Sequence, residues 1–286
     1  MRISQILKDN KSGVSFEFFP YKTPKGKEQL RQAVRALKNY NPLYMSMTYG
    51  AGGASQEMTK EAVYMFMEET DRVVMPHLTC IGATKSSIDS LLDEYKTKGI
   101  ENIMALRGDI PRDAPDFDIT KGEFVHARDL VSFVKQYGNF SIGVAVYPEG
   151  HIESASLEAD LDYTRRKIDC GAEFAVTQMF FDNTFYHNFY EKCRGRGINI
   201  PIVPGIMPVT DLNKLRQFVS ICRTTIPESL IKQVEPFLNK PQEMEKAGLE
   251  FTIKQCRGLL ANGVKFLHFF TLNKAEVIKK IVEAIR

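Results

Sequence analysis

The sequence predicts an α/β fold, because short apolar runs alternate along the whole chain with longer amphipathic runs. Most of the apolar runs are continuous, as expected for parallel strands that are covered on both faces. Glycines stand where helical patterns end, shortly before the next apolar run, at positions 99, 138, 171, 197 and 263. Glycine can take the left-handed conformation that closes a helix, so these positions predict helix ends.

Each apolar run predicts one strand. In chain order the predicted strands are 14–19, 43–49, 73–80, 102–107, 141–147, 174–181, 200–206 and 264–271. Helical patterns lie between them, among them 28–40, 56–70, 86–98, 124–137 and 157–170. Near the C-terminus, Thr210 or Asp211 is expected to cap a helix at Leu212–Cys222, and Asn273 a helix at 274–285. Segment 227–262 exceeds one helix and predicts extra helices, Glu228–Val234 and Pro241–Ala261, before the last strand.

Eight strand–helix units favour a single (β/α)8 TIM barrel with extra helices before the last strand. The length of 286 residues suits one barrel, and no composition break or long linker divides residues 1–286 into domains. A doubly wound open sheet is the alternative. That fold would need a glycine-rich fingerprint after the first strand to bind a dinucleotide, and Phe19-Pro20-Tyr21-Lys22 stands there instead.

Composition narrows the classes of function. The net charge is +3, and no block of like charge indicates a nucleic-acid partner. No apolar run reaches 18 residues, so no membrane span is expected. The five cysteines include no CxxC pair, which argues against a disulfide framework and a zinc or iron–sulfur site. A leaderless chain with scattered cysteines fits a cytoplasmic protein.

Polar residues gather where the predicted strands end, and in a barrel those ends form the active face. The clearest case is Arg107-Gly108-Asp109, where a cation, a glycine and a carboxylate follow an apolar strand. Asp109 is equally consistent with a helix-start carboxylate and with a site residue. His77 is equally consistent with a structural histidine and with a ligand. His126 and His187 lie in helical patterns and are expected at the surface.

Glu17 stands among phenylalanines, where an unpaired carboxylate is unfavourable. It either pairs with a cation inside the barrel or serves as a general acid, and desolvation would then raise its pKa. The sequence carries no metal-binding spacing, no Gly-x-Ser-x-Gly elbow and no P-loop. Acid–base groups without a nucleophile or metal indicate that a cofactor supplies the reactive atom.

The strand-end motifs identify a family. They are Phe16-Glu17-Phe18-Phe19-Pro20, Thr48-Tyr49-Gly50-Ala51, Pro76-His77-Leu78-Thr79-Cys80, Leu106-Arg107-Gly108-Asp109, Tyr147-Pro148-Glu149, Thr177-Gln178-Met179-Phe180-Phe181, Pro204-Gly205-Ile206-Met207-Pro208 and His268-Phe269-Phe270-Thr271-Leu272-Asn273. Together, from about residue 14 to 276, they resemble bacterial-type 5,10-methylenetetrahydrofolate reductase. The resemblance implies a homo-oligomeric FAD barrel, without the C-terminal regulatory domain of the eukaryotic enzymes, that reduces 5,10-methylenetetrahydrofolate to 5-methyltetrahydrofolate by ping-pong hydride transfer.

The resemblance also implies site residues. Glu17 would be the general acid that helps to open the methylene bridge, and Asp109 would contact both flavin and pterin. Gln178, Leu212 and Lys274 would complete the folate site. FAD contacts would come from Thr48, His77, Arg107, Gly108, Asp109, Ala145, Tyr147, His151, Asp160 and Lys167.

Several positions depart from the family pattern. Leu212 replaces an aromatic residue that stacks on the substrate, and Lys274 replaces an arginine near the folate. Tyr163 and Gly82 also differ from the bacterial pattern. These departures leave the electron donor open: it could be NADH, NADPH or a partner protein. In the last case this chain would be a pterin- and flavin-binding subunit of a larger methyl-branch complex. A flavin-free aldolase-type barrel would need a Schiff-base lysine, which the strands before Lys265 do not offer.

Overall fold

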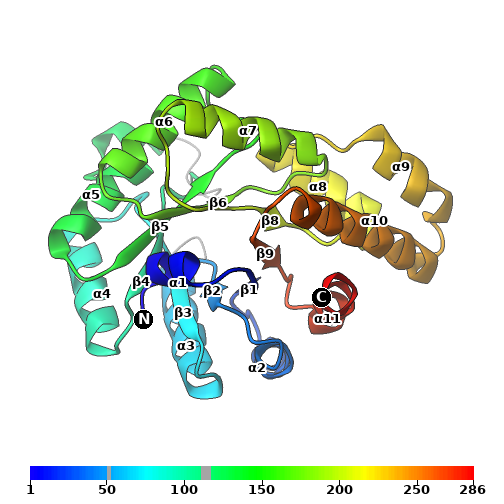
Figure 1. Cartoon of the computed structure of the whole chain (residues 1–286). Coiled ribbons are helices and arrows are strands. Elements are labelled where there is room, and N and C mark those ends of the chain that lie inside the picture. The colour runs from blue at the N-terminus through cyan, green and yellow to red at the C-terminus, as the bar shows by residue number, and fades with distance from the viewer. Residues whose placement is uncertain (50–52, 111–116) are drawn as a thin grey trace.

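Parallel strands form one continuous sheet in the computed structural model, which describes residues 1–49, 53–110 and 117–286 (Figure 1). The sheet order is β7-β6-β5-β4-β3-β2-β1-β9-β8. The strands are β1 Gly13–Phe18, β2 Tyr44–Met47, β3 Val73–Thr79, β4 Asn102–Leu106, β5 Ser141–Val146, β6 Phe174–Thr177, β7 Ile202–Val203, β8 Gly205–Ile206 and β9 Phe266–Phe270. This arrangement confirms the predicted α/β barrel.

The seventh predicted strand is split at Pro204, and the split is where the ring closes. β7 pairs with β6 before the proline, and β8 pairs with β9 after it. Proline cannot donate a ladder hydrogen bond. The Pro204 carbonyl still accepts one from the His268 backbone N–H at 3.0 Å. One residue therefore interrupts the strand without opening the barrel.

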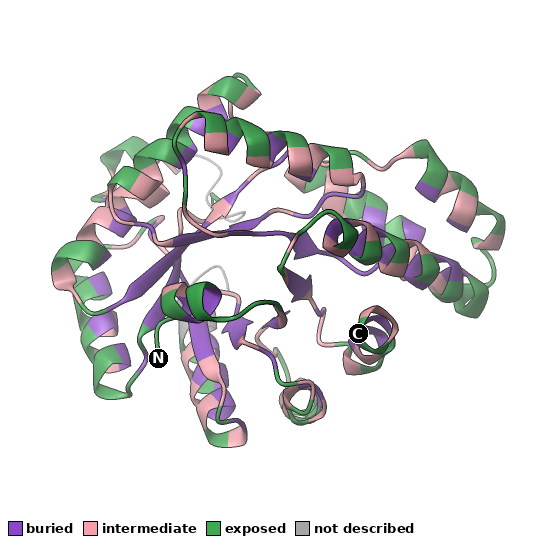
Figure 2. Ribbon diagram, viewed as in Figure 1, coloured by how far each residue is buried: buried purple, intermediate pink, exposed green. Residues whose placement is uncertain are grey.

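Helices surround the ring, with their buried faces turned to the strands and their exposed faces outward (Figure 2). They are α2 Pro24–Lys38, α3 Gly53–Glu69, α4 Lys85–Thr97, α5 Ala127–Tyr137, α6 Leu157–Asp169, α7 Asn183–Gly195, α8 Leu212–Cys222 and α11 Ala275–Ile285. Short 3-10 turns occur at Ile119–Lys121 and Glu235–Phe237. The five glycines expected at helix ends all have positive φ, between 71° and 122°, which confirms that prediction.

The extra helices are confirmed as α9 Glu228–Val234 and α10 Pro241–Ala261, which extend to the right of the barrel in Figure 1. With α8 they enclose a second apolar cluster, which also takes in Met179 and Phe181 after β6 and Met207 and Val209 after β8. The insertion is therefore packed against loops at the carboxyl end of the strands.

One helix was not predicted. α1 Ile3–Asp9 lies across the amino end of the barrel, where Ile3 and Ile6 join the interior side chains of the strands. The Ile3 N–H donates to the side chain of Asn102, at the start of β4, at 2.7 Å. Because α1 closes this end, access to the interior is from the carboxyl end.

The capping predictions had mixed outcomes. Asp211 caps α8 by accepting from the Lys214 N–H at 3.0 Å, as expected. Asn273 does not cap α11, which begins two residues later. Its carboxamide instead accepts from the Phe19 N–H at 3.0 Å and donates to the Phe19 carbonyl at 2.9 Å. Asn273 therefore ties the loop after β9 to the loop after β1.

The closure predicts a specific sensitivity at Gly205. A Cβ there would lie 2.3 Å from the Thr177 carbonyl oxygen, so the backbones of β6 and β8 would have to separate. We expect Gly205→Ala to lower the free energy of unfolding by about 1–3 kcal/mol in urea titrations. Gly195→Ala is the matched control, because a Cβ added there would have nothing within 4 Å. Equal effects of the two substitutions would contradict this account of closure.

Candidate active site

A large cavity opens at the carboxyl ends of the strands, with a volume of about 740 Å³. That volume falls within the roughly 300–1,000 Å³ typical of ligand pockets. The cavity brings together nearly all of the predicted site residues: Glu17, Thr48, His77, Arg107, Gly108, Asp109, Ala145, Tyr147, His151, Asp160, Lys167 and Gln178. Gly50 and Ala51 of the second motif lie outside the described residues.

Two predicted folate contacts are not in the cavity lining. Leu212 is fully buried in the second apolar cluster, because it begins α8 and packs beside Met244, whose sulfur accepts from the Leu212 N–H. Lys274 is exposed, and its ammonium donates to the Thr210 hydroxyl at 3.2 Å. The structure therefore does not bring these two side chains into the cavity with the other predicted site residues.

The expectation that His126 and His187 lie at the surface is also corrected by the structure, where both are partly buried. His126 occupies the N-cap position of α5 and lines the cavity, with its ring 6.0 Å from that of Tyr163. His187 lies on α7, partly buried, edge-on to Tyr186. A helical pattern places a residue on a helix but does not show which end of the helix faces the barrel mouth.

Glu17, on β1, is a buried carboxylate of the cavity, 7% exposed. The Nε2 atoms of His77 and of His268 each lie 3.3 Å from its Oε2. Burial alone would raise the pKa of Glu17, but the charge of His77 and the hydrogen bond from His268 outweigh it and lower the pKa to about 2. The sequence-based expectation of a raised pKa is therefore wrong, because the imidazoles come from distant strands.

The side wall of the cavity carries a lysine and an aspartate from α6. Lys167 donates to the Ala145 carbonyl at 2.6 Å, and burial lowers its pKa to about 8 although Asp160 opposes this. Burial raises the pKa of Asp160, with Lys167 opposing. One oxygen of Asp160 accepts from the Ser154 hydroxyl at 3.0 Å, and the other, Oδ2, is buried without a partner. An acceptor of this kind suits a ligand hydroxyl.

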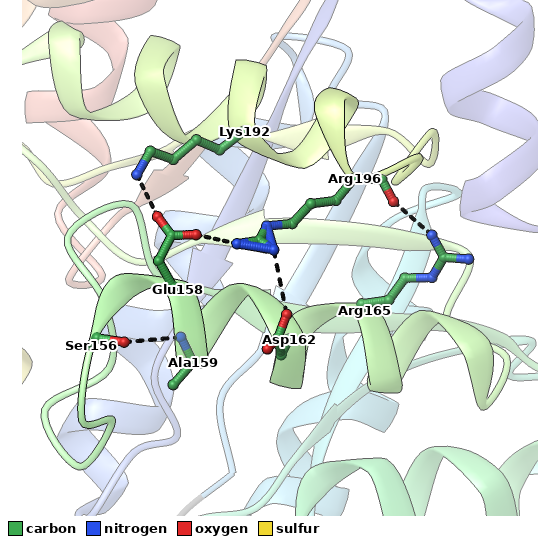
Figure 3. Close-up of polar contacts among 7 residues, drawn as sticks. All are labelled: Ser156, Glu158, Ala159, Asp162, Arg165, Lys192 and Arg196. Atoms are coloured by element: carbon green, nitrogen blue, oxygen red, sulfur yellow. Dashed lines mark hydrogen bonds and ion pairs between the residues drawn. The ribbon is translucent and has the colours of Figure 1, made fainter.

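The outer face of α6 is fastened to α7 by a polar network (Figure 3). Glu158 pairs with Lys192 at 2.7 Å and with Arg196, which also reaches Asp162 at 3.4 Å. Arg165 donates to the Arg196 carbonyl at 2.7 Å. Individual exposed pairs contribute little to stability, but together these contacts hold the helix that presents Asp160 and Lys167 to the cavity.

Arg107 is paired within the protein. Its guanidinium forms a two-point contact with the carboxylate of Glu153, with Nη2 2.6 Å from Oε1, and its Nε donates to the Gly108 carbonyl at 3.1 Å. Both Arg107 and Glu153 line the cavity. Sequence reasoning missed Glu153, because nothing in its local sequence distinguishes it from other loop carboxylates.

The cavity suits an anionic, ring-containing cofactor better than a metal ion. Within the described ranges, no group of three or more His, Cys, Asp or Glu side chains is placed to hold a metal. The lining instead offers the cations Arg107 and Lys167, the unpartnered Asp160 oxygen, and the rings of Tyr147 and Tyr163. Of the helices that the structure describes, none is long and apolar enough to cross a bilayer.

The fold and cavity define a barrel enzyme whose chemistry takes place at the carboxyl ends of its strands. Comparison with known proteins then identifies the family: the methylenetetrahydrofolate reductase family model matches residues 2–286. The 5,10-methylenetetrahydrofolate reductase of Pectobacterium carotovorum is 37% identical over 264 residues, which cover 92% of this chain and 87% of that protein. The chain therefore belongs to the methylenetetrahydrofolate reductase family.

Other relatives are longer. Methylenetetrahydrofolate reductase (NADH) 1 of Arabidopsis thaliana is 36% identical over 283 residues, and this chain spans only 48% of its length. Among solved structures, an uncharacterised protein from Clostridium thermocellum aligns over the whole chain with a TM-score of 0.64 and 13% identity. At that identity the likeness shows the fold alone.

Lys167 generates a stability prediction. Its pKa is about 8 in the folded chain and 10.5 in the reference state, so between these values the unfolded chain holds more protons and stability rises with pH. From pH 7.5 to 9.5, the ligand-free wild type should gain about 1–2 kcal/mol relative to Lys167→Met in urea titrations. Parallel pH dependences of the two proteins would refute the assignment.

Proposed function

We propose that this chain reduces 5,10-methylenetetrahydrofolate to 5-methyltetrahydrofolate, with FAD as resident cofactor and NADH or NADPH as electron donor, in a ping-pong order. The observation that carries the proposal is that one cavity holds Glu17 and Asp109 together with Arg107, Asp160 and Lys167. Family membership supports the reaction, and the Arabidopsis relative is named for NADH. The Clostridium thermocellum neighbour is described as binding 5-methyl-5,6,7,8-tetrahydrofolic acid.

The residues fit the proposed cofactor on chemical grounds. Arg107 and Lys167 would balance the charge of its phosphates, and the Asp160 oxygen without a partner would accept from a hydroxyl. Thr48, His77, Gly108, Ala145, Tyr147 and His151 would complete its contacts. Bound FAD would supply the hydride-carrying ring, a chemistry that amino-acid side chains do not provide.

The carboxylates would divide the work on the folate. Glu17 would deliver a proton to the nitrogen that leaves the methylene carbon, which opens the bridge to an iminium ion. Asp109, exposed at the rim, would stabilise that cation electrostatically. Gln178 would hydrogen-bond the pterin. Its carboxamide oxygen accepts from the Met179 N–H at 2.9 Å, which fixes the orientation of the amide.

A partner protein as electron donor is the weaker alternative. It was suggested by Leu212 at a position where the family has a stacking ring. Leu212 packs in the second apolar cluster and is not part of the cavity lining, which gives this alternative little support. Anaerobic mixing of the purified flavoprotein with NADH or NADPH distinguishes the two: bleaching of the flavin supports an autonomous enzyme, and persistent colour supports a protein donor. The proposal includes a cytoplasmic homo-oligomer, on the resemblance alone.

Glu17→Gln should separate the two half-reactions. The amide cannot deliver a proton, so we expect reduction of the folate to slow by at least about 100-fold. Reduction of the flavin by its donor should stay within about twofold, because that step needs no proton from Glu17. Rapid mixing that follows flavin absorbance measures both rates. An equal loss in both half-reactions would refute the acid role of Glu17.

Asp109→Asn tests the rim carboxylate. Removal of a negative charge beside the flavin should raise its reduction potential, and loss of cation stabilisation should slow folate reduction by about 10–100-fold. Spectroelectrochemical titration gives the potential, and single-turnover absorbance gives the rate. If neither quantity changes, Asp109 has no part in the site.

A further inference from the structure

His268 and Ser15 stand behind Glu17 in the barrel interior. Glu17 lines the cavity, whereas His268 has no exposed surface and is absent from the lining. β1 and β9 pair so that Ser15 lies opposite His268. Ser15 and Glu17 are two residues apart on β1, so both side chains project to the same side of the sheet. The neighbouring residues Phe16 and Phe18 point the other way, into the main apolar core.

The imidazole of His268 connects these two side chains. Its Nε2 lies 3.3 Å from Glu17 Oε2, and its Nδ1 lies 2.7 Å from the Ser15 hydroxyl. Its ring is stacked on Tyr44 at a centroid distance of 5.5 Å and 21°, with Phe270 edge-on at 5.7 Å. The ring is therefore fixed in orientation, and with it the carboxylate to which it is bonded.

Ser15 allows His268 to change its protonation state without losing a hydrogen bond. When the imidazole is neutral with its proton on Nε2, it donates to Glu17, and the Ser15 hydroxyl donates to Nδ1. When the imidazole is cationic, Nδ1–H donates to the same hydroxyl oxygen, which can also accept. When His268 gains or loses a proton, the buried polar atoms of Ser15, His268 and Glu17 therefore all keep a hydrogen-bond partner. The side chains need to move little.

His77 is placed differently. Its Nε2 is at the same distance from Glu17 Oε2 but lacks hydrogen-bond geometry, and its ring lines the cavity, where a ligand would contact it. Tyr44 of β2 is a further titratable side chain against His268, and burial raises its pKa. Of the two imidazoles at Glu17, only that of His268 combines a hydrogen bond to the carboxylate with a second partner behind it.

We propose that His268, backed by Ser15, is a positioning residue that orients Glu17 and holds a proton one hydrogen bond away from it. The inference deepens the proposed function and rests on it. One proton passes from the Nε2 of cationic His268 to the ionised Glu17, and then from Glu17 to the folate nitrogen as the bond from that nitrogen to the methylene carbon breaks. Neutral His268 and ionised Glu17 remain, and one proton from solvent restores the pair.

The first test is a titration of the Glu17 carboxyl in the ligand-free chain by ¹³C NMR, with the signal assigned by its loss in Glu17→Gln. In the wild type, the carboxyl should stay ionised down to about pH 4. In His268→Asn its pKa should rise by about one pH unit or more, because burial is then opposed by one imidazole only. Ser46→Ala is the matched control: Ser46 is a fully buried barrel serine opposite Glu17 on β2 whose hydroxyl has no partner.

The second test is the pH profile of folate reduction. His268→Asn should slow this half-reaction by about 10-fold or more and move its pH dependence, while the donor half-reaction is unchanged. Ser15→Ala keeps the imidazole and should give a smaller effect in the same direction, so the inference stays testable if His268→Asn does not fold. His268→Gln keeps a donor but cannot carry a proton. It should preserve the KM for the folate and still show the altered pH profile.

The outcomes separate this inference from the proposed function. If the wild type does not reduce 5,10-methylenetetrahydrofolate, the proposed function fails, and the carboxyl titration still decides whether His268 controls Glu17. If the wild type is active but His268→Asn leaves both the pKa of Glu17 and the pH profile unchanged, the inference is overturned and the function stands. Equal changes in Ser15→Ala and Ser46→Ala would also overturn it.

Discussion

The buried carboxylate of Glu17 is the constraint around which the site is organised. A charge inside an apolar barrel is unfavourable unless it is paired. Here the pairing comes from two imidazoles on β3 and β9, the strands on either side of the β1–β2 pair. They are brought together by the pairing of β9, the last strand of the chain, with β1, the first. The register of β1 with β9 therefore helps to hold one ionised group at the floor of the cavity.

The charged side chains at the sides of the cavity are also paired within the protein. Arg107 is held by Glu153. Burial lowers the pKa of Lys167 and raises that of Asp160, and each of these two groups opposes the shift of the other. Each cation is thus balanced within the protein, at a position where an anionic ligand would contact it. Such a lining is preorganised, because the side chains are oriented by the protein before a ligand arrives, and α6 is in turn secured to α7 on its outer face.

Much of the fold could be predicted because the signals are local. Apolar runs and helix-ending glycines reveal where strands and helices lie, and parallel strands place their carboxyl ends together. The same rule, with the resemblance, placed Glu17, His77, Arg107, Asp109 and Gln178 in one cavity. The direction of the pKa shift of Glu17 could not be predicted, because it depends on His77 and His268 of other strands, and His268 is 251 residues away in the sequence.

Other features escaped for related reasons. α1 is short, and what fixes it is contact with the barrel floor rather than its own sequence. The resemblance assigns Leu212 and Lys274 to the folate site, whereas in the structure Leu212 packs in the second apolar cluster and Lys274 donates to Thr210. For the hydrogen-bonded group of Ser15, His268 and Glu17, the sequence offers one indication: Ser15 and Glu17 alternate with phenylalanines on one strand. Alternation shows that two polar side chains face the interior but not what they meet there.

A structure of the chain with FAD and 5-methyltetrahydrofolate bound would test the central claim most directly. The account predicts that both molecules occupy the one cavity at the carboxyl ends of the strands. The folate should be within hydrogen-bond distance of Glu17 and Asp109, and His268 should remain bonded to Glu17. A folate bound elsewhere on the barrel, with Glu17 facing only protein, would contradict it.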